Sequence, residues 1–337
     1  MKQRRLSDRN VSAIGLGCMG FSHAYGTPMD LDEAKGVLRH ALDIGYTHFD
    51  TATAYGRGKN EQLVGEALRD RRSEFFLASK CGLFVGDDGR EIDGHPARIR
   101  SACEDSLKRL GVDFIDLYYL HRLDKRVPIE DSVGALAELK SEGKIGSIGL
   151  SEVSARTVRR AHAVHPIAAV QSEYSLWTRN PELGVLDMCA ELGITLVAFS
   201  PLGRGFLSGR LTLDDVERFG ERDIRRRMPR FLPENYSRNL DLITGLREVA
   251  DDVGCTLSQL ALAWVLSRGE QVVAIPGTTK AGHLEEDAAG AAVDLPPAAV
   301  ERLDALMAPK NVVGHRYSAA QQADIDTEEY DSAEVNA

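Results

Sequence analysis

The chain has few cysteines and no long apolar run. Its 337 residues include five cysteines, an odd number, and no two of them form a C-x-x-C pair. Scattered cysteines of this kind favour reduced thiols over a disulfide framework or a zinc site, so we expect no metal. No apolar run reaches the roughly 18 residues that a membrane span needs, and none follows the basic N-terminus. We therefore expect a cytoplasmic protein without a leader peptide or a membrane anchor.

The chain also lacks an excess of positive charge. The chain has 41 Lys and Arg against 51 Asp and Glu, which gives a net charge of −10. Nucleic-acid-binding domains usually carry a basic surface, so we do not expect a nucleic-acid partner. Hydrophobic residues make up 43% and charged residues 27%, which is typical of a globular protein. A small molecule is the expected partner, and no pattern indicates an oligomeric state.

The chain lacks the G-x-x-x-x-G-K-[ST] phosphate-binding motif, but it contains a G-x-G-x-x-G pattern. Gly15, Gly17 and Gly20 supply its glycines, directly after an expected strand. In a dinucleotide-binding fold a helix begins at once after this pattern. Here FSHAYGTPMD follows, and the next helix is expected near Asp30 or Asp32. We interpret the pattern as a glycine-rich loop at the carboxyl end of a strand.

Eight short apolar runs alternate with amphipathic segments along the chain. Such runs are typical of parallel strands that are buried on both faces, and the segments between them suit crossover helices. Eight strand–helix units predict an α/β fold, a (β/α)₈ TIM barrel, rather than an open sheet. The expected strands are residues 11–16, 46–49, 75–79, 114–120, 145–150, 168–170, 194–199 and 272–275.

A barrel of this kind needs about 250 residues, so the chain has residues to spare. We expect a single barrel domain over residues 1–310, with two additional helices and long loops on its C-terminal face. Residues 311–337 form an acidic tail, with six Asp and Glu and no Lys or Arg after Arg316. The additional helices are expected at residues 257–267 and 298–306, and the loops at 81–94 and 210–239.

Four ionisable residues follow three consecutive strands. Asp50 ends the second expected strand and Tyr55 lies just beyond it, while Lys80 and His121 end the third and fourth strands. Active sites of these barrels lie at the carboxyl ends of the strands, so the four side chains should converge there. Each of them alone has an ordinary structural explanation. Together, at successive strand ends, they predict a catalytic site.

The four residue types suit the reduction of a carbonyl group. A free tyrosine has a pKa of about 10, and a nearby Lys80 ammonium should lower it. Asp50 would hold that ammonium in a partly buried pair. Tyr55 would then donate a proton to the developing alkoxide, as a general acid. His121 would orient the carbonyl and stabilise its oxygen with a hydrogen bond.

With these residues the chain resembles the aldo-keto reductase superfamily, over roughly residues 5–308. Asp50, Tyr55, Lys80 and His121 match the catalytic tetrad of that family. The local motifs read, in order, GLGCMGFS, HFDTATAYG, FFLASK, LYYLHR, GLSE, FSPLGRGFL and IPGTTK. This order is similar to the bacterial and fungal branch, which is related to the potassium-channel β-subunits. The resemblance implies NADPH-dependent reduction of aldehydes or ketones to alcohols.

The resemblance also implies where NADP(H) binds. Ser151 and Gln171 match the positions that hold the nicotinamide carboxamide, and Phe199 matches an aromatic residue that stacks on the ring. Thr278, Thr279 and Lys280 match the 2′-phosphate pocket. The remaining expected contacts are Met19, Gly20, Asp50, Glu152, Ser200, Pro201, Leu202, Gly203, Gly205, Arg210, Gly277, His283, Glu286 and Asp287.

Three of these positions depart from the family pattern. Glu152 stands where many members have Asn, and Asp287 replaces a common Asn beside the adenine. His283 stands where other branches carry Arg, which implies a weaker grip on the 2′-phosphate. The basic run at residues 225–227 is expected in a solvated loop, with a position over the cofactor as the alternative.

The substrate pocket is expected to be apolar. Phe21, Tyr25, Phe84 and Trp177, together with Met19, would surround the mouth beside Tyr55 and suit an aromatic or medium-sized aliphatic aldehyde. Arg122 follows His121 and would attract an anionic substrate, although a position that faces solvent or a carboxylate is favoured.

Two other functions remain open. A non-catalytic NADPH-binding regulator of the same fold would resemble the potassium-channel β-subunits. Those relatives usually carry Asn at the histidine position, so His121 favours the enzyme. A barrel lyase or isomerase without a nucleotide is the other alternative, and the IPGTTK and FSPLGRG loops argue against it.

Overall fold

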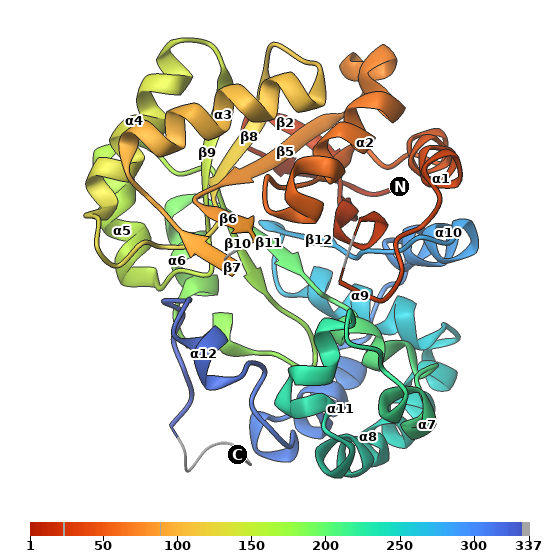
Figure 1. Cartoon of the computed structure of the whole chain (residues 1–337). Coiled ribbons are helices and arrows are strands. Elements are labelled where there is room, and N and C mark those ends of the chain that lie inside the picture. The colour runs from red at the N-terminus through yellow and green to blue at the C-terminus, as the bar shows by residue number, and fades with distance from the viewer. Residues whose placement is uncertain (23, 88, 332–337) are drawn as a thin grey trace.

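The computed structural model describes residues 1–22, 24–87 and 89–331. Eight parallel strands form one sheet, and helices cover its outer face (Figure 1). This confirms the predicted (β/α)₈ barrel. In sheet order, the strands are β3 (Leu16–Gly17), β4 (His48–Asp50), β5 (Phe76–Cys81), β8 (Ile115–Leu120), β9 (Ile145–Ser151), β10 (Ala169–Glu173), β11 (Thr195–Phe199) and β12 (Val272–Ile275).

The barrel closes between its first and last strands. Ile14 forms a parallel bridge with Ala274, and the Gly17 amide donates a hydrogen bond of 2.9 Å to the Pro276 carbonyl. A Cβ atom on Gly17 would lie only 3.0 Å from the Ile275 carbonyl oxygen. The close approach of the two backbones therefore favours glycine at this seam.

The first expected strand, residues 11–16, is wrong in its extent. Residues 11 and 12 belong to an antiparallel hairpin, β1 (Gln3–Leu6) with β2 (Arg9–Ser12), and the barrel strand β3 has only two residues. Leu6 and Val11 of the hairpin pack against the side chains that fill the barrel interior. Because Val11 is buried like the residues of the barrel strand, residues 11–16 read as one continuous apolar strand in the sequence.

The helices that surround the barrel follow the strands. α1 begins after Asp30, whose carboxylate accepts hydrogen bonds from the Asp32 and Glu33 amides, and the glycine-rich pattern ends within the short turn Cys18–Phe21. This confirms our interpretation of that pattern as a loop. The surrounding helices are α1 (Leu31–Asp43), α2 (Lys59–Leu68), α3 (Pro96–Leu110), α4 (Ile129–Ser141), α5 (Ala155–Val164), α6 (Val185–Leu192), α9 (Leu257–Ser267) and α10 (Ala281–Gly290).

One of the two expected additional helices is wrongly assigned. α9 packs directly on β12 and lies in the barrel layer, which its nearly continuous apolar sequence requires. The additional helices are α8 (Pro233–Val253) and α11 (Pro297–Leu306), which pack on each other together with the short α7 (Leu213–Glu217) below the barrel in Figure 1. Much of the expected loop at residues 210–239 is thus helical.

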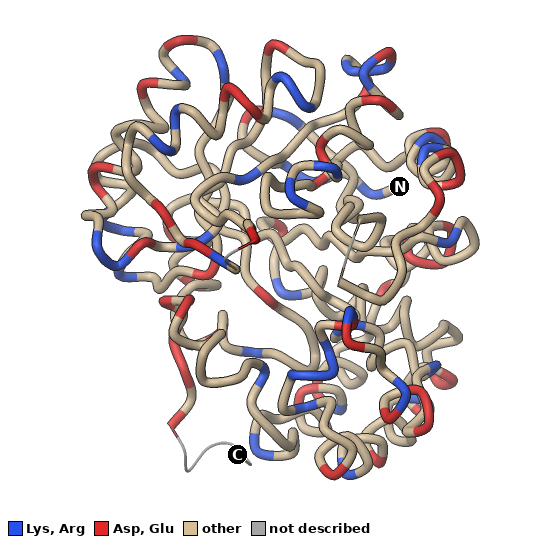
Figure 2. Tube along the Cα trace, in the orientation of Figure 1, with Lys and Arg blue, Asp and Glu red and all other residues tan. Residues whose placement is uncertain are grey.

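Two other segments carry more structure than expected. The loop at residues 81–94 contains a hairpin, β6 (Leu83–Gly86) with β7 (Gly89–Ile92). Residues 311–331 of the acidic tail lie against the barrel and include α12 (Ala319–Gln322) (Figure 1). A domain boundary at residue 310 stays a prediction. Basic and acidic residues are interspersed along the outer helices (Figure 2).

Within the described residues, no single helix is both long and apolar enough to cross a membrane. Taken together, α8 and α9 have the length and apolar composition of a span, but the chain bends by 82° between them.

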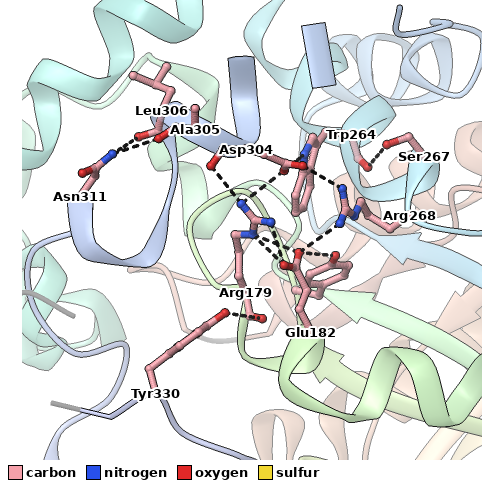
Figure 3. A network of polar contacts seen from close by, with 11 residues as sticks. Arg179, Glu182, Trp264, Ser267, Arg268, Asp304, Ala305, Leu306, Asn311 and Tyr330 are labelled. Carbon is pink, nitrogen blue, oxygen red and sulfur yellow. Dashed lines mark hydrogen bonds and ion pairs between the residues drawn. The ribbon is translucent and has the colours of Figure 1, made fainter. Parts of the chain in front are cut away.

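A polar network clamps α11 to the barrel (Figure 3). Arg179 and Arg268 pair with Asp304 of α11 at 3.3 and 3.1 Å, and the Trp264 indole nitrogen donates to the same carboxylate at 3.0 Å. The Tyr330 hydroxyl of the tail donates to the Arg179 carbonyl at 3.1 Å. One carboxylate therefore accepts bonds from the loop after β10 and from α9.

We expect Asp304→Ala to lower the free energy of unfolding by about 2 kcal/mol, because the Trp264 indole loses its acceptor and two guanidinium groups lose a shared counter-charge. Asp252→Ala is the matched control, since it removes an exposed pair with Arg302 between α8 and α11. That loss should stay within about 0.5 kcal/mol. Urea unfolding of both variants measures the difference, and equal losses would contradict the clamp.

Candidate active site

The four predicted residues meet at the carboxyl ends of β4, β5 and β8. Lys80 Nζ donates hydrogen bonds to the Asp50 carboxylate, to the Thr51 carbonyl at 2.9 Å and to the Tyr55 hydroxyl at 3.4 Å. The rings of Tyr55 and His121 lie nearly perpendicular, with 5.7 Å between their centres. The strand ends thus bring together side chains that are far apart in the sequence.

The Asp50–Lys80 pair is shut away from solvent, with exposed side-chain fractions of 2% and 0%. Burial by itself lowers the pKa of Lys80, but Asp50 and Tyr55 together raise it by more, so that the pKa lies above its ordinary value. Lys80 is therefore charged at neutral pH. Asp50 also accepts a hydrogen bond of 2.8 Å from the Gln171 amide, which ties the pair to β10.

The expected net lowering of the Tyr55 pKa is wrong for this structure. Burial raises the pKa of the phenol, and the Lys80 ammonium lowers it by less. Lys80 acts in the expected direction, but desolvation dominates because the ring lies deep in the mouth. The phenol keeps its proton at neutral pH, which suits a proton donor.

Tyr55 lines a cavity of about 1020 Å³ at the barrel mouth. Most residues of the expected cofactor and substrate sites line it, contributed by strand ends, by the loops after β3, β4, β11 and β12, and by α10. Those in the lining are Met19, Gly20, Tyr25, Asp50, Tyr55, His121, Ser151, Gln171, Phe199, Ser200, Pro201, Leu202, Gly205, Arg210, Gly277, Thr278, Thr279, Lys280, His283, Glu286 and Asp287.

The two ends of the cavity differ in chemistry. At the end with the four predicted residues, Gln171 donates to Asp50, and the Ser151 hydroxyl accepts a hydrogen bond of 3.4 Å from Arg122, the neighbour of His121. At the other end α10 begins directly after Lys280, so that its positive N-terminus faces the lining. Arg210 pairs there with Glu286 at 2.7 Å.

Two expected cofactor residues do not line the cavity. Gly203 belongs to the loop after β11 and has a φ of +55°. A Cβ atom at this position would meet the Trp177 ring at 3.0 Å. Glu152 is fully buried, and its carboxylate pairs with Arg316 at 2.6 Å and accepts from the Glu173 amide at 2.8 Å. The expected cofactor contact of Glu152 is therefore replaced by a buried ion pair with the tail.

Three of the expected pocket residues are also misplaced. Phe84 does not line the cavity, because Leu83 and Val85 of β6 face it and side chains alternate along a strand. Phe21 is buried in the hydrophobic core. Trp177 is buried as well, stacked on Phe206 with 3.9 Å between the ring centres. A large aromatic residue near a strand end can thus pack in the hydrophobic core instead of lining a ligand pocket.

Arg225 of the basic run is not in a solvated loop as expected. It pairs with Asp223 at 2.7 Å, its guanidinium lies 4.1 Å from the centre of the Phe219 ring, and it lines the cavity. Arg226 and Arg227 are exposed. Only the first arginine of the run therefore contributes to the mouth.

Sequence reasoning missed the contribution of the tail. Tyr317, Gln321 and Ile325 line the cavity, although they lie in the acidic tail, from which no site residue was expected. Asp326 accepts hydrogen bonds from the Ser154 amide and hydroxyl, at the N-terminus of α5. Large apolar and aromatic residues inside an otherwise acidic segment were the available signal that it packs on the barrel.

We expect Arg316→Ala to lower the free energy of unfolding by about 3 kcal/mol, because it leaves the Glu152 carboxylate buried without its cation. The double variant Glu152→Gln/Arg316→Met removes both charges and should recover part of that loss. Urea unfolding measures both, with limited proteolysis to detect release of the tail. If the single variant were as stable as the wild type, the pair would not hold the tail.

Fold and site together define a barrel protein whose mouth holds a buried carboxylate–ammonium pair next to a tyrosine that lines a large cavity. Residues 13–308 match the model of the Aldo/keto reductase family. The chain belongs to this family.

Individual relatives agree with this assignment. The probable aldo-keto reductase 1 of Glycine max is 44% identical over 309 residues, which cover 91% of this chain and 88% of that protein. The glycerol dehydrogenase of Gluconobacter oxydans superposes with a TM-score of 0.83 at 30% identity, covering 91% and 95% of the two chains. An aldo/keto reductase of Klebsiella pneumoniae, solved with NADP and acetate, gives 0.71 at 29% identity, covering 94% and 99%.

Proposed function

We propose that this protein reduces aldehydes or ketones to alcohols with NADPH, and that Tyr55 is the general acid. The observation that carries the proposal is the hydrogen bond from the buried Lys80 ammonium to the Tyr55 hydroxyl, 3.4 Å long, at the wall of the cavity. A positive charge held at this point favours the phenolate that remains after the proton leaves.

The other residues of the group support this chemistry. The bound nicotinamide would supply the hydride. Tyr55 donates its proton to the carbonyl oxygen of the substrate, and Lys80, held by Asp50, stabilises the phenolate that is left. His121, whose ring stands against that of Tyr55, orients the carbonyl and donates to its oxygen. The two rings thus form the wall against which the carbonyl binds.

The lining of the cavity fits NADP(H). Phe199 offers an aromatic face and Ser151 and Gln171 offer polar groups at the end near Tyr55, where a nicotinamide would lie. Gly205 keeps a φ of +99° in the loop that would follow the pyrophosphate. Lys280, at the N-terminus of α10, adds a cation to a helix end that attracts anions, which suits the 2′-phosphate.

The protonation states of Asp287 and His283 explain how these two departures from the family pattern could suit the cofactor. Burial, with a smaller contribution from Glu286, raises the pKa of Asp287 to about 8. Its carboxyl group is mostly protonated at neutral pH and offers one donor and one acceptor, as an Asn does. Burial, Arg210 and Lys280 lower the pKa of His283, so this imidazole adds no charge for the 2′-phosphate.

The proposed substrate is a small carbonyl compound, and the proposed location is the cytoplasm. The five cysteines are free, and four of them are buried, which fits a reducing compartment.

We expect Tyr55→Phe to lower kcat/KM for carbonyl reduction by about a thousandfold, because general-acid catalysis is lost. NADPH affinity should hardly change. NADPH oxidation with 4-nitrobenzaldehyde measures the first value and NADPH fluorescence the second. Tyr330→Phe is the control, since it removes a hydroxyl that bonds to Arg179 outside the cavity. Wild-type turnover in Tyr55→Phe would reject the mechanism, and tight NADPH binding by a wild type that reduces no carbonyl would favour the regulatory alternative.

We expect Lys280→Ala to weaken NADPH binding by about tenfold or more, the size of one charge-assisted hydrogen bond. NADH lacks the 2′-phosphate, so its dissociation constant should change little and serves as the internal control. Fluorescence titration of both nucleotides measures the ratio. Equal losses for NADPH and NADH would remove the case for a phosphate pocket at the start of α10.

A further inference from the structure

Five arginines line the cavity, and four of them have a carboxylate partner. Arg204 is buried beside Glu173, with 2.8 Å between guanidinium and carboxylate. The other three pairs are Arg90 with Asp324 at 3.2 Å, Arg210 with Glu286 at 2.7 Å and Arg225 with Asp223 at 2.7 Å. The charges of these four are therefore compensated within the chain.

Arg122 differs from the other four. Over residues 1–22, 24–87 and 89–331, no Asp or Glu lies within ion-pair distance of its guanidinium. Its Nη1 donates to the His121 carbonyl at 2.6 Å and to the Ser151 hydroxyl at 3.4 Å. Its Nε is buried without a partner, and Nη2 makes no hydrogen bond with the described residues. Half-buried at the wall of a cavity, this guanidinium lacks the counter-charge that such a position favours.

The position of Arg122 is where a substrate would bind. It follows His121 at the end of β8, and its charge lowers the pKa of Tyr55, though by less than burial raises it. Apolar side chains line the same cavity, among them Leu83, Val85 and Ile325. Of the two expected surroundings of Arg122, a carboxylate of the chain is therefore absent within the described residues, and exposure to solvent in the cavity stays a prediction.

We propose that the substrate carries a carboxylate on an apolar body, and that Arg122 binds this carboxylate while the carbonyl group lies against Tyr55 and His121. The proposal rests on the proposed reductase function and names its substrate class. One uncompensated guanidinium matches one carboxylate in charge, and its planar donors match the two oxygens. The carboxylate takes no part in the reduction; it orients the carbonyl and anchors the acid.

A matched pair of aldehydes tests the proposal in the full-length protein. 4-Carboxybenzaldehyde and methyl 4-formylbenzoate have the same ring and reacting group, but only the first carries a charge. We expect the wild type to prefer the acid in kcat/KM. In Arg122→Gln, the acid-to-ester ratio should fall by about tenfold or more, the size of one charge-assisted hydrogen bond. Arg122→Lys keeps the charge and should retain part of the preference.

Arg90→Gln is the matched control, because it removes a charge from the same cavity, but one that Asp324 already compensates. We expect its acid-to-ester ratio to stay near that of the wild type. A ratio that is unchanged in Arg122→Gln, or that falls equally in Arg90→Gln, overturns the proposal, as does a large loss of NADPH affinity in Arg122→Gln. That loss would assign Arg122 to the cofactor.

A binding measurement separates this proposal from the proposed function. Benzoate, with benzamide as its neutral counterpart, is titrated calorimetrically into the complex of the protein with NADP⁺. Benzoate binding that Arg122→Gln abolishes supports the anion site even if neither aldehyde is reduced, in which case only the reductase function fails. Equal binding of benzoate by the wild type and Arg122→Gln overturns the anion site, even if both aldehydes are reduced.

Discussion

The buried pair between Asp50 and Lys80 is the interaction on which the rest of the site depends. Two charges this far from solvent are tolerated only when each satisfies the other and additional hydrogen bonds hold both. Thr51, directly after β4, and Gln171 of β10 supply those bonds. The pair therefore requires a closed barrel with β4, β5 and β10 in register. In return, it holds one positive charge at the Tyr55 hydroxyl.

A second buried charge system ties the tail to the barrel. Glu152 with Arg316 and Glu173 with Arg204 are neighbouring ion pairs, joined by the hydrogen bond from the Glu173 amide to Glu152, and Arg204 also lines the cavity. Leaving one of these charges unpaired is costly, so the pair between Glu152 and Arg316 holds the tail against the barrel. The consequence for the site is that Tyr317 and its neighbours form part of the wall of the cavity.

Most of the barrel and the meeting of Asp50, Tyr55, Lys80 and His121 at its mouth could be predicted, because both follow from local patterns. Apolar runs indicate buried strands, and a polar residue directly after such a run lies at the mouth. The side that a residue faces is different, because it depends on register: Phe84 lies one position from two residues that line the cavity. Trp177 was misassigned because stacking on Phe206 satisfies an aromatic ring as well as a ligand would.

The sequence by itself determined the eight-strand alternation, the family resemblance and the four side chains at successive strand ends, because each depends on a residue type and its spacing. Only the tertiary structure decided which arginines have a counter-charge, since most of their partners lie far away in the chain: Asp324 is the partner of Arg90, and Arg122 has none within the described residues. It also decided the direction of the Tyr55 pKa shift, because burial outweighs the nearby ammonium. Charge compensation and desolvation are properties of three-dimensional neighbours, which a linear pattern does not specify.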